Sequence, residues 1–191
     1  MKPALLALLM GPLLVGQERL VEGNPASAVR ILVYEDLQCP DCADFRRMLD
    51  EKLLPKYGSR IAVEHRDFPL PKHQWAMPAA VASRYFQRQD PALAVKFRQW
   101  AMSSQKSITA QNFESRLAEF ARNNGVDPAR VSAALADASL RKLVQADFDE
   151  GVARGVAHTP TVFAGGEAFI ETFSVEDISR GIDEAAARAK Q

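Results

Sequence analysis

Cys39 and Cys42 are the two residues whose types and spacing point most directly to chemistry. They are separated by Pro40 and Asp41, and they are the only cysteines in the 191-residue sequence. A bond between them would close a loop of about four residues, which restricts the unfolded chain very little and makes a poor structural cross-link. The pair is therefore interpreted as a redox-active dithiol, and half of a zinc site or two buried thiols are the alternatives.

Zinc binding would need ligands beyond the two cysteines, because a structural zinc site takes four. The sequence has three histidines, His65, His73 and His158, and none of them shows ligand spacing with another. No metal and no bound cofactor are therefore expected, and the redox group is the disulfide of the cysteine pair itself.

The segments around the pair predict the elements that position it. The apolar, β-branched run 29–34 predicts a buried strand, and apolar residues at helical spacing predict a helix that begins at or near Cys39. A second strand over 61–66 completes a strand-helix-strand unit, which implies parallel pairing. A helix N-terminus would stabilise a thiolate at Cys39, and Cys42, one turn later, could attack the mixed disulfide.

The rest of the chain is predicted to be a helical stretch followed by a hairpin and a helix. Residues 73–153 read as helical, with breaks at Asp90-Pro91 and at three later points. Two short strands around Gly165-Gly166 predict a β-hairpin, and Ser174 with Asp177 predicts the N-terminus of a last helix. The fold class is therefore α/β.

Three segments in a fixed order identify a resemblance. The sequence resembles the DsbA-like branch of the thioredoxin superfamily over about residues 20–188. The segments that carry it are Cys39-Pro40-Asp41-Cys42, then Asp67-Phe68-Pro69-Leu70 followed by His73, and Gly155-Val156 with Thr159-Pro160-Thr161-Val162-Phe163 after the helical stretch.

The resemblance implies a thioredoxin-like fold with a helical insertion between the βαβ half and the C-terminal β-hairpin plus helix. It also implies that Pro160 is cis and lies against the cysteine pair, and that Thr159 offers its backbone to an extended substrate segment. Binding of this kind, by strand addition, would accept many unfolded or thiol-containing proteins without reading their sequence.

One position departs from the family pattern. It lacks the acidic residue that, in the family, helps move a proton to and from the second cysteine. Members of the branch commonly carry an acidic residue six positions before the first cysteine, where this chain has Val33. Glu35 lies on the same strand face as Val33 by period-two spacing, and Glu64 on the second strand is another candidate. The alternative is that both are ordinary polar residues near strand ends.

Asp41 and His158 are expected to modulate the site in opposite senses. The Asp41 carboxylate would oppose a thiolate at Cys39, which would make the protein a weaker oxidant. His158, two positions before Pro160, would favour the thiolate if it reaches the cysteines in its protonated form. The alternative for His158 is a loop histidine in solvent.

The N-terminus predicts export. Residues 1–16 combine Lys2 with a short apolar run and are interpreted as a signal peptide, 17–28 as a linker, and 29–191 as the DsbA-like thioredoxin domain. An apolar helix packed on the domain is the alternative, and a cytoplasmic location stays open. Lys plus Arg equals Asp plus Glu, at 24 each, which disfavours nucleic acid as a partner.

These features predict a monomeric, periplasmic or otherwise extracytoplasmic protein dithiol-disulfide oxidoreductase. It would oxidise exported proteins through its Cys-Pro-Asp-Cys motif and be recharged by a membrane redox partner. A protein-disulfide reductase would share every motif. A non-catalytic peptide-binding or chaperone module is the alternative from another functional class.

Overall fold

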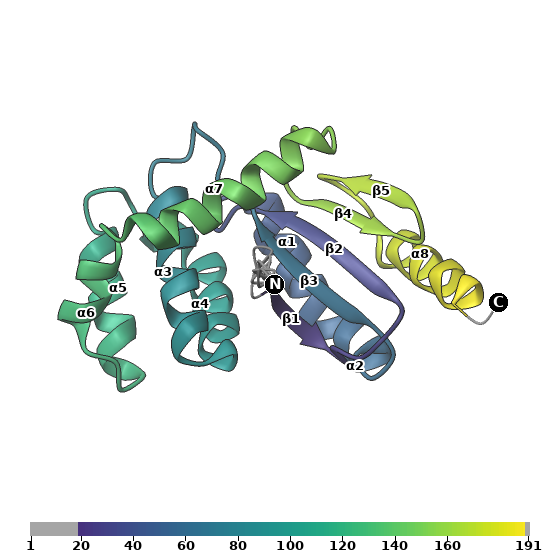
Figure 1. Cartoon of the computed structure of the whole chain (residues 1–191), viewed down its shortest axis with the longest axis horizontal. Coiled ribbons are helices and arrows are strands. Elements are labelled where there is room, and N and C mark those ends of the chain that lie inside the picture. The colour runs from purple at the N-terminus through teal and green to yellow at the C-terminus, as the bar shows by residue number, and fades with distance from the viewer. Residues whose placement is uncertain (1–18, 190–191) are drawn as a thin grey trace, which may run out of the picture.

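The computed structural model describes residues 19–189, whose strands form one mixed sheet in the order β1-β3-β2-β4-β5 (Figure 1). The central strands β2 and β3 are parallel, and the other neighbouring pairs are antiparallel. The strands are β1 (Leu20–Gly23), β2 (Arg30–Glu35), β3 (Ala62–Asp67), β4 (Thr161–Ala164) and β5 (Glu167–Ile170).

The connection between β2 and β3 is the helix that carries the cysteine pair. It runs through α1 (Pro40–Met48), a π-helical turn η1 (Leu49–Leu53) and α2 (Leu54–Tyr57). The parallel register of β2 and β3 confirms the predicted strand-helix-strand unit, with Val33 opposite His65. Because β2 ends at Glu35, the turn that follows delivers Cys39 to the carboxyl end of the central strand.

The helices between β3 and β4 form the predicted insertion. They are α3 (Ala76–Gln89), α4 (Pro91–Ser103), the 3-10 turn η2 (Gln105–Ser107), α5 (Phe113–Asn123), α6 (Pro128–Ala134) and α7 (Ala138–Ala153). Asp90, Asp127 and Asp137 each accept a backbone N–H bond at the start of a helix, which explains why the chain breaks there. Figure 1 shows α3 to α6 gathered at one end of the sheet, and α7 crossing in front of it.

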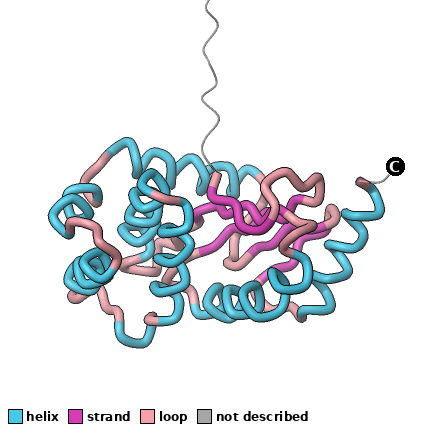
Figure 2. Tube along the Cα trace, turned by 90° about the horizontal axis from the view of Figure 1, so that it is seen from below, coloured by secondary structure: helices cyan, strands magenta, loops and turns pink. Residues whose placement is uncertain are grey.

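Helices cover both faces of the sheet (Figure 2). On one face, Val33 and its neighbours pack with Phe45 of α1 and Ile178 of α8 (Val175–Arg188). On the other face, Tyr34 and Phe68 pack with α7, where Phe68 stacks on Phe148 at 4.4 Å between ring centroids. The sheet thus has two apolar sides, as its central parallel pair requires.

The C-terminal part matches its prediction closely. Strands β4 and β5 form an antiparallel hairpin around Gly165 and Gly166, both of which have positive φ angles. Ser174 and Asp177 form a capping box at the start of α8. The predicted fold class, an α/β thioredoxin-like fold with a helical insertion, is confirmed.

The prediction of a linker over residues 17–28 is wrong for residues 20–23. These residues form strand β1, which pairs antiparallel with β3 in the register Leu20 to His65. Leu20 is only 2% exposed and belongs to the core shared with α3 and α4. The folded domain therefore begins before residue 29. The proposed signal peptide lies outside the described residues.

Within residues 19–189, none of the helices combines the length and the apolar character needed to cross a membrane.

Candidate active site

The two cysteines lie at the N-terminus of α1. Cys39 is the N-cap residue, Pro40 is the first helical residue, and the Ala43 N–H donates to the Cys39 carbonyl at 3.2 Å. Cys39 is 5% exposed and Cys42 is fully buried, and both are free thiols in this structure. The predicted helix start at Cys39 is confirmed.

Cys39 is the thiol that this geometry makes acidic. A hydrogen bond from the Cys42 side chain is the largest effect on Cys39, and burial opposes it. Further hydrogen bonds from the backbone N–H groups of Cys42 and Asp41 contribute, and the pKa of Cys39 is lowered to about 6, against an ordinary value of 9.0. Most of Cys39 is therefore thiolate at neutral pH, which makes it the nucleophile.

Cys42 is held in the opposite state. Burial, together with the hydrogen bond and negative charge of Cys39, raises the pKa of Cys42 well above its ordinary value. The Asp36 backbone N–H donates to Cys42 Sγ at 3.3 Å and acts against this rise. Cys42 thus stays a thiol while Cys39 is a thiolate, as expected for a resolving cysteine.

Thr159 and Pro160 lie directly beside the cysteine pair. The Thr159-Pro160 peptide bond is cis, as the resemblance implied. Cys39 Sγ lies 3.2 Å from the Thr159 carbonyl oxygen, to which the thiol form donates. The Thr159 N–H has no hydrogen-bond partner among the described residues. Residues 120 positions apart in the sequence therefore form one site.

Asp41 and His158 lie at the surface. Asp41 is exposed in the first turn of α1, and its backbone N–H rather than its carboxylate is among the main effects on Cys39. The His158 side chain is 59% exposed, and its Nδ1 lies 3.0 Å from Glu171. This placement matches a loop histidine in solvent, and an effect of His158 on the thiolate stays a prediction.

Glu35 is buried on the same sheet face as Val33, as the spacing predicted. Its carboxylate pairs with the His65 ring and, at 3.0 Å, with Arg98. Burial alone would raise the pKa of Glu35, but Arg98 and His65 outweigh it and hold the pKa at about 2. Glu35 is therefore a permanent anion that slightly raises the pKa of Cys42, and it is a poor carrier of a proton.

Glu64 lies on the other face of the sheet. It is opposite Leu32 in the register, and its carboxylate pairs with Arg30 at 2.5 Å and with Arg66 at 2.8 Å. Because α1 packs on the face of Val33, Glu64 is separated from the cysteines by the sheet. Its candidacy as a proton relay is wrong.

The residues that hold the turn before α1 carry no recognisable motif in the sequence. The Asp36 carboxylate accepts from the Leu70 N–H at 2.8 Å, and Gln38 Oε1 accepts from the Trp75 N–H at 2.8 Å. From the insertion, Gln105 Nε2 donates to the carbonyls of residues 37 and 39, at 3.0 and 2.9 Å. The only local signal was an aspartate three residues before Cys39, where a turn is expected.

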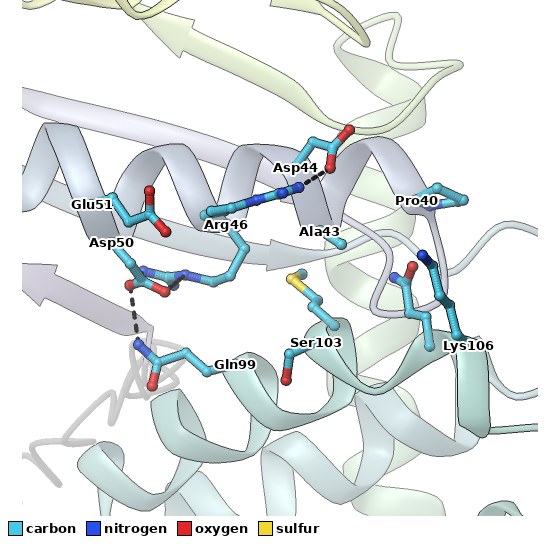
Figure 3. Close-up of a pocket in the computed structure, with 12 residues that line it drawn as sticks. Pro40, Ala43, Asp44, Arg46, Asp50, Glu51, Gln99, Ser103 and Lys106 are labelled. Carbon is cyan, nitrogen blue, oxygen red and sulfur yellow. Dashed lines mark hydrogen bonds and ion pairs between the residues drawn. The ribbon is translucent and has the colours of Figure 1, made fainter.

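A groove of about 800 Å³ runs beside the site, between α1 and α4 (Figure 3). It starts at Pro40, and Ala43 and Met102 form its apolar part. Arg46 and Gln99 meet at Asp50 in its wall. Neither cysteine lines this groove. No group of three or more His, Cys, Asp or Glu side chains suited to a metal ion occurs among residues 19–189.

A helix that begins at the first of two cysteines, beside a cis-proline at the start of an adjacent strand, defines the dithiol site of the thioredoxin fold. The chain belongs to the thioredoxin family, because a family model described as Thioredoxin matches residues 16–184. This match and the fold confirm the family resemblance seen in the sequence.

Solved structures of DsbA proteins share this fold at low sequence identity. Wolbachia pipientis alpha-DsbA1 has a TM-score of 0.77 and 18% identity, with 91% of this chain and 93% of that chain covered. Chlamydia trachomatis DsbA has a TM-score of 0.72 and 19% identity, with 90% and 92% covered. Bacillus subtilis BdbD has a TM-score of 0.72 and 18% identity, with 91% and 94% covered. No curated protein matched in the sequence search.

Proposed function

We propose that the protein is a thiol:disulfide oxidoreductase that oxidises exported proteins through Cys39 and Cys42. The observation that carries this proposal is the acidic thiol of Cys39, beside Thr159 and cis-Pro160. A similar structure, alpha-DsbA2 from Wolbachia pipientis, is described as a thiol-disulfide exchange protein, with a TM-score of 0.72 and 20% identity.

In the proposed reaction, a substrate thiolate attacks Cys39 Sγ of the oxidised pair. The Cys39–Cys42 bond breaks, a mixed disulfide forms at Cys39, and Cys42 leaves as a thiolate that takes up a proton. A second substrate thiolate then attacks the substrate sulfur of the mixed disulfide and releases Cys39 as a thiolate. The substrate loses two electrons and the cysteine pair gains them.

Substrate binding is proposed to use the backbone of Thr159. Its N–H lacks a partner among the described residues, and its carbonyl is 3.2 Å from Cys39 Sγ. An extended segment paired with this backbone would bring its own cysteine to the nucleophile. Main-chain pairing of this kind does not depend on the side chains of the segment.

The direction of exchange follows from the stabilised thiolate. A low pKa at Cys39 stabilises the reduced pair relative to the disulfide, and this favours oxidation of substrates. The test is the reduction potential of the pair, titrated against glutathione with alkylation and intact mass as the readout. We expect a value less negative than about −180 mV; a value near or below about −250 mV would mean a protein-disulfide reductase instead.

A non-catalytic peptide-binding or chaperone module is distinguished by the Cys39→Ser variant. We expect this variant to lose all turnover in the reoxidation of a reduced, unfolded protein substrate. If the wild-type protein also gives no turnover while both proteins bind the unfolded substrate equally, the cysteines are incidental to the function.

We further propose that the protein acts outside the cytoplasm as a monomer and is recharged by a membrane redox partner. Another similar structure is a periplasmic thioredoxin-like protein from Salmonella enterica serovar Typhimurium, with a TM-score of 0.75 and 18% identity. The test is the intact mass of the protein recovered from an extracytoplasmic fraction. Loss of about the first 16 residues supports a cleaved signal peptide, and a full-length cytoplasmic protein opposes export.

A further inference from the structure

Asp36 is a buried carboxylate that the proposed reaction does not use. Its side chain has no exposed surface, and it lies in the turn between β2 and Cys39. The Gln38 N–H donates to one of its oxygens at 2.7 Å. The Leu70 N–H and His73 Nδ1 lie 2.8 and 2.7 Å from the other oxygen. This carboxylate therefore joins the turn to the 68–75 loop.

The same residue contacts the resolving cysteine through its backbone. The Asp36 N–H donates to Cys42 Sγ at 3.3 Å, and the Asp36 carbonyl accepts from the Cys39 N–H at 3.1 Å. A donor aimed at sulfur stabilises the thiolate more than the thiol. At Cys42, where burial and Cys39 both oppose ionisation, this N–H is a favourable contact that the fold supplies.

Neither Glu35 nor Val33 supplies such a contact. Glu35 adds negative charge, which opposes a thiolate, and its carboxylate is occupied by His65 and Arg98. Val33, where the family resemblance leads to an acidic residue being expected, is an apolar core residue. The orientation of the Asp36 N–H therefore matters for the chemistry at Cys42.

We propose that Asp36 and His73 are positioning residues for thiol exchange: their hydrogen bond holds the 36–39 turn so that the Asp36 N–H stabilises the Cys42 thiolate. The inference rests on the proposed function, because Cys42 is a thiolate only while it leaves or attacks a disulfide. His73 is 16% exposed on its side chain and holds the turn from the loop after β3.

The experiment follows the reaction of the reduced protein with 5,5′-dithiobis(2-nitrobenzoate) in a stopped-flow instrument. The Cys39 thiolate attacks this disulfide, forms a mixed disulfide and releases one nitrothiobenzoate. Cys42 then loses its proton, attacks Cys39 Sγ and releases the second nitrothiobenzoate, which leaves the Cys39–Cys42 disulfide. The first phase thus reports Cys39 and the second phase reports Cys42.

We expect His73→Ala to slow the second phase by about tenfold, the size of one weakened hydrogen bond to an ionised sulfur. The first phase should change by less than about twofold, and Asp36→Asn should show the same selective effect. His73→Asn is the conservative variant, because its side-chain amide can donate to Asp36 in place of Nδ1, and it should restore most of the second-phase rate. Arg130→Gln, at a residue of α6 whose side chain is 78% exposed, is the matched control and should leave both phases unchanged.

The inference is overturned if the second phase is unchanged in His73→Ala and Asp36→Asn, or if both phases slow equally. It is also overturned if His73→Asn is as slow as His73→Ala, because the donor would then be irrelevant. The small disulfide needs no protein substrate. If the variants slow only the second phase but the wild-type protein does not oxidise unfolded substrates, the proposed function is refuted and the positioning role is retained.

Discussion

The hydrogen bond from Cys42 to Cys39 can be removed without touching the nucleophile. It is the largest cause of the low pKa of Cys39, ahead of the contributions of the backbone N–H groups at the start of α1. Cys42→Ala deletes the donor, whereas Cys42→Ser replaces it with a hydroxyl that can donate from the same position. The two variants therefore differ in the one interaction under test.

The expected size follows from the energy of one charge-assisted hydrogen bond. Such a bond contributes about 1.5–3 kcal/mol, and each 1.36 kcal/mol corresponds to about one pKa unit. At the lower end of this range, Cys42→Ala should raise the pKa of Cys39 from about 6 to about 7. It should not return to 9.0, because the backbone donors of α1 remain.

The assay is the rate of alkylation of Cys39 by iodoacetamide as a function of pH, read by intact mass. Each variant has a single cysteine, so the rate reports one thiolate. Cys42→Ser should titrate near the wild-type value and Cys42→Ala about one unit higher. Equal pKa values in the two variants would refute the role of the Cys42 donor and leave the helix N-terminus as the cause.

Three further predictions concern the network under the site. Arg98→Met removes one of the two partners of the buried Glu35 carboxylate and should lower the free energy of unfolding in urea by about 3 kcal/mol, against less than about 0.5 kcal/mol for exposed Arg130→Met. The pKa of both Glu22 and Glu35 is lowered to about 2 from 4.5, so their stabilisation is complete above about pH 4.5 and lost as the pH falls toward 2. Urea unfolding measured across that pH range should show this loss of stability, and a free energy of unfolding that does not change with pH would contradict the pairing. Gln105→Ala removes two bonds to the active-site turn and should speed amide hydrogen exchange at Cys39 about tenfold, whereas unchanged exchange would show that the turn is held without it.

The elements around the cysteines were predictable because their signals are local. The strand expected over 29–34 is observed at Arg30–Glu35, and the hairpin turns at Gly165-Gly166 as predicted. Strand β1 was missed because its four residues carry no period of their own and are held by pairing with β3. A strand of this kind is determined by its neighbour in space rather than by its own sequence.

The site was predictable only in part, for the same physical reason. Period-two spacing placed Glu35 on the correct sheet face, but no local pattern shows that Arg98, 63 positions later, neutralises it. Gln105 likewise reaches Cys39 across 66 positions. The spacing of Glu35 showed on which face of the sheet its carboxylate lies. Whether that carboxylate is ionised depends on Arg98, which the fold brings in from the helical insertion.

The opposite states of the two thiols come from one shared interaction. Because Cys42 donates to Cys39, it lowers the pKa of Cys39, and the resulting negative charge raises the pKa of Cys42 in turn. Burial then decides which sulfur ionises, since Cys39 is 5% exposed and Cys42 is fully buried. Because Cys42 is a thiolate only transiently, it needs a hydrogen-bond donor at the moment of exchange rather than a permanent base. The Asp36 N–H can meet that need, so an apolar residue at Val33 is compatible with the proposed exchange.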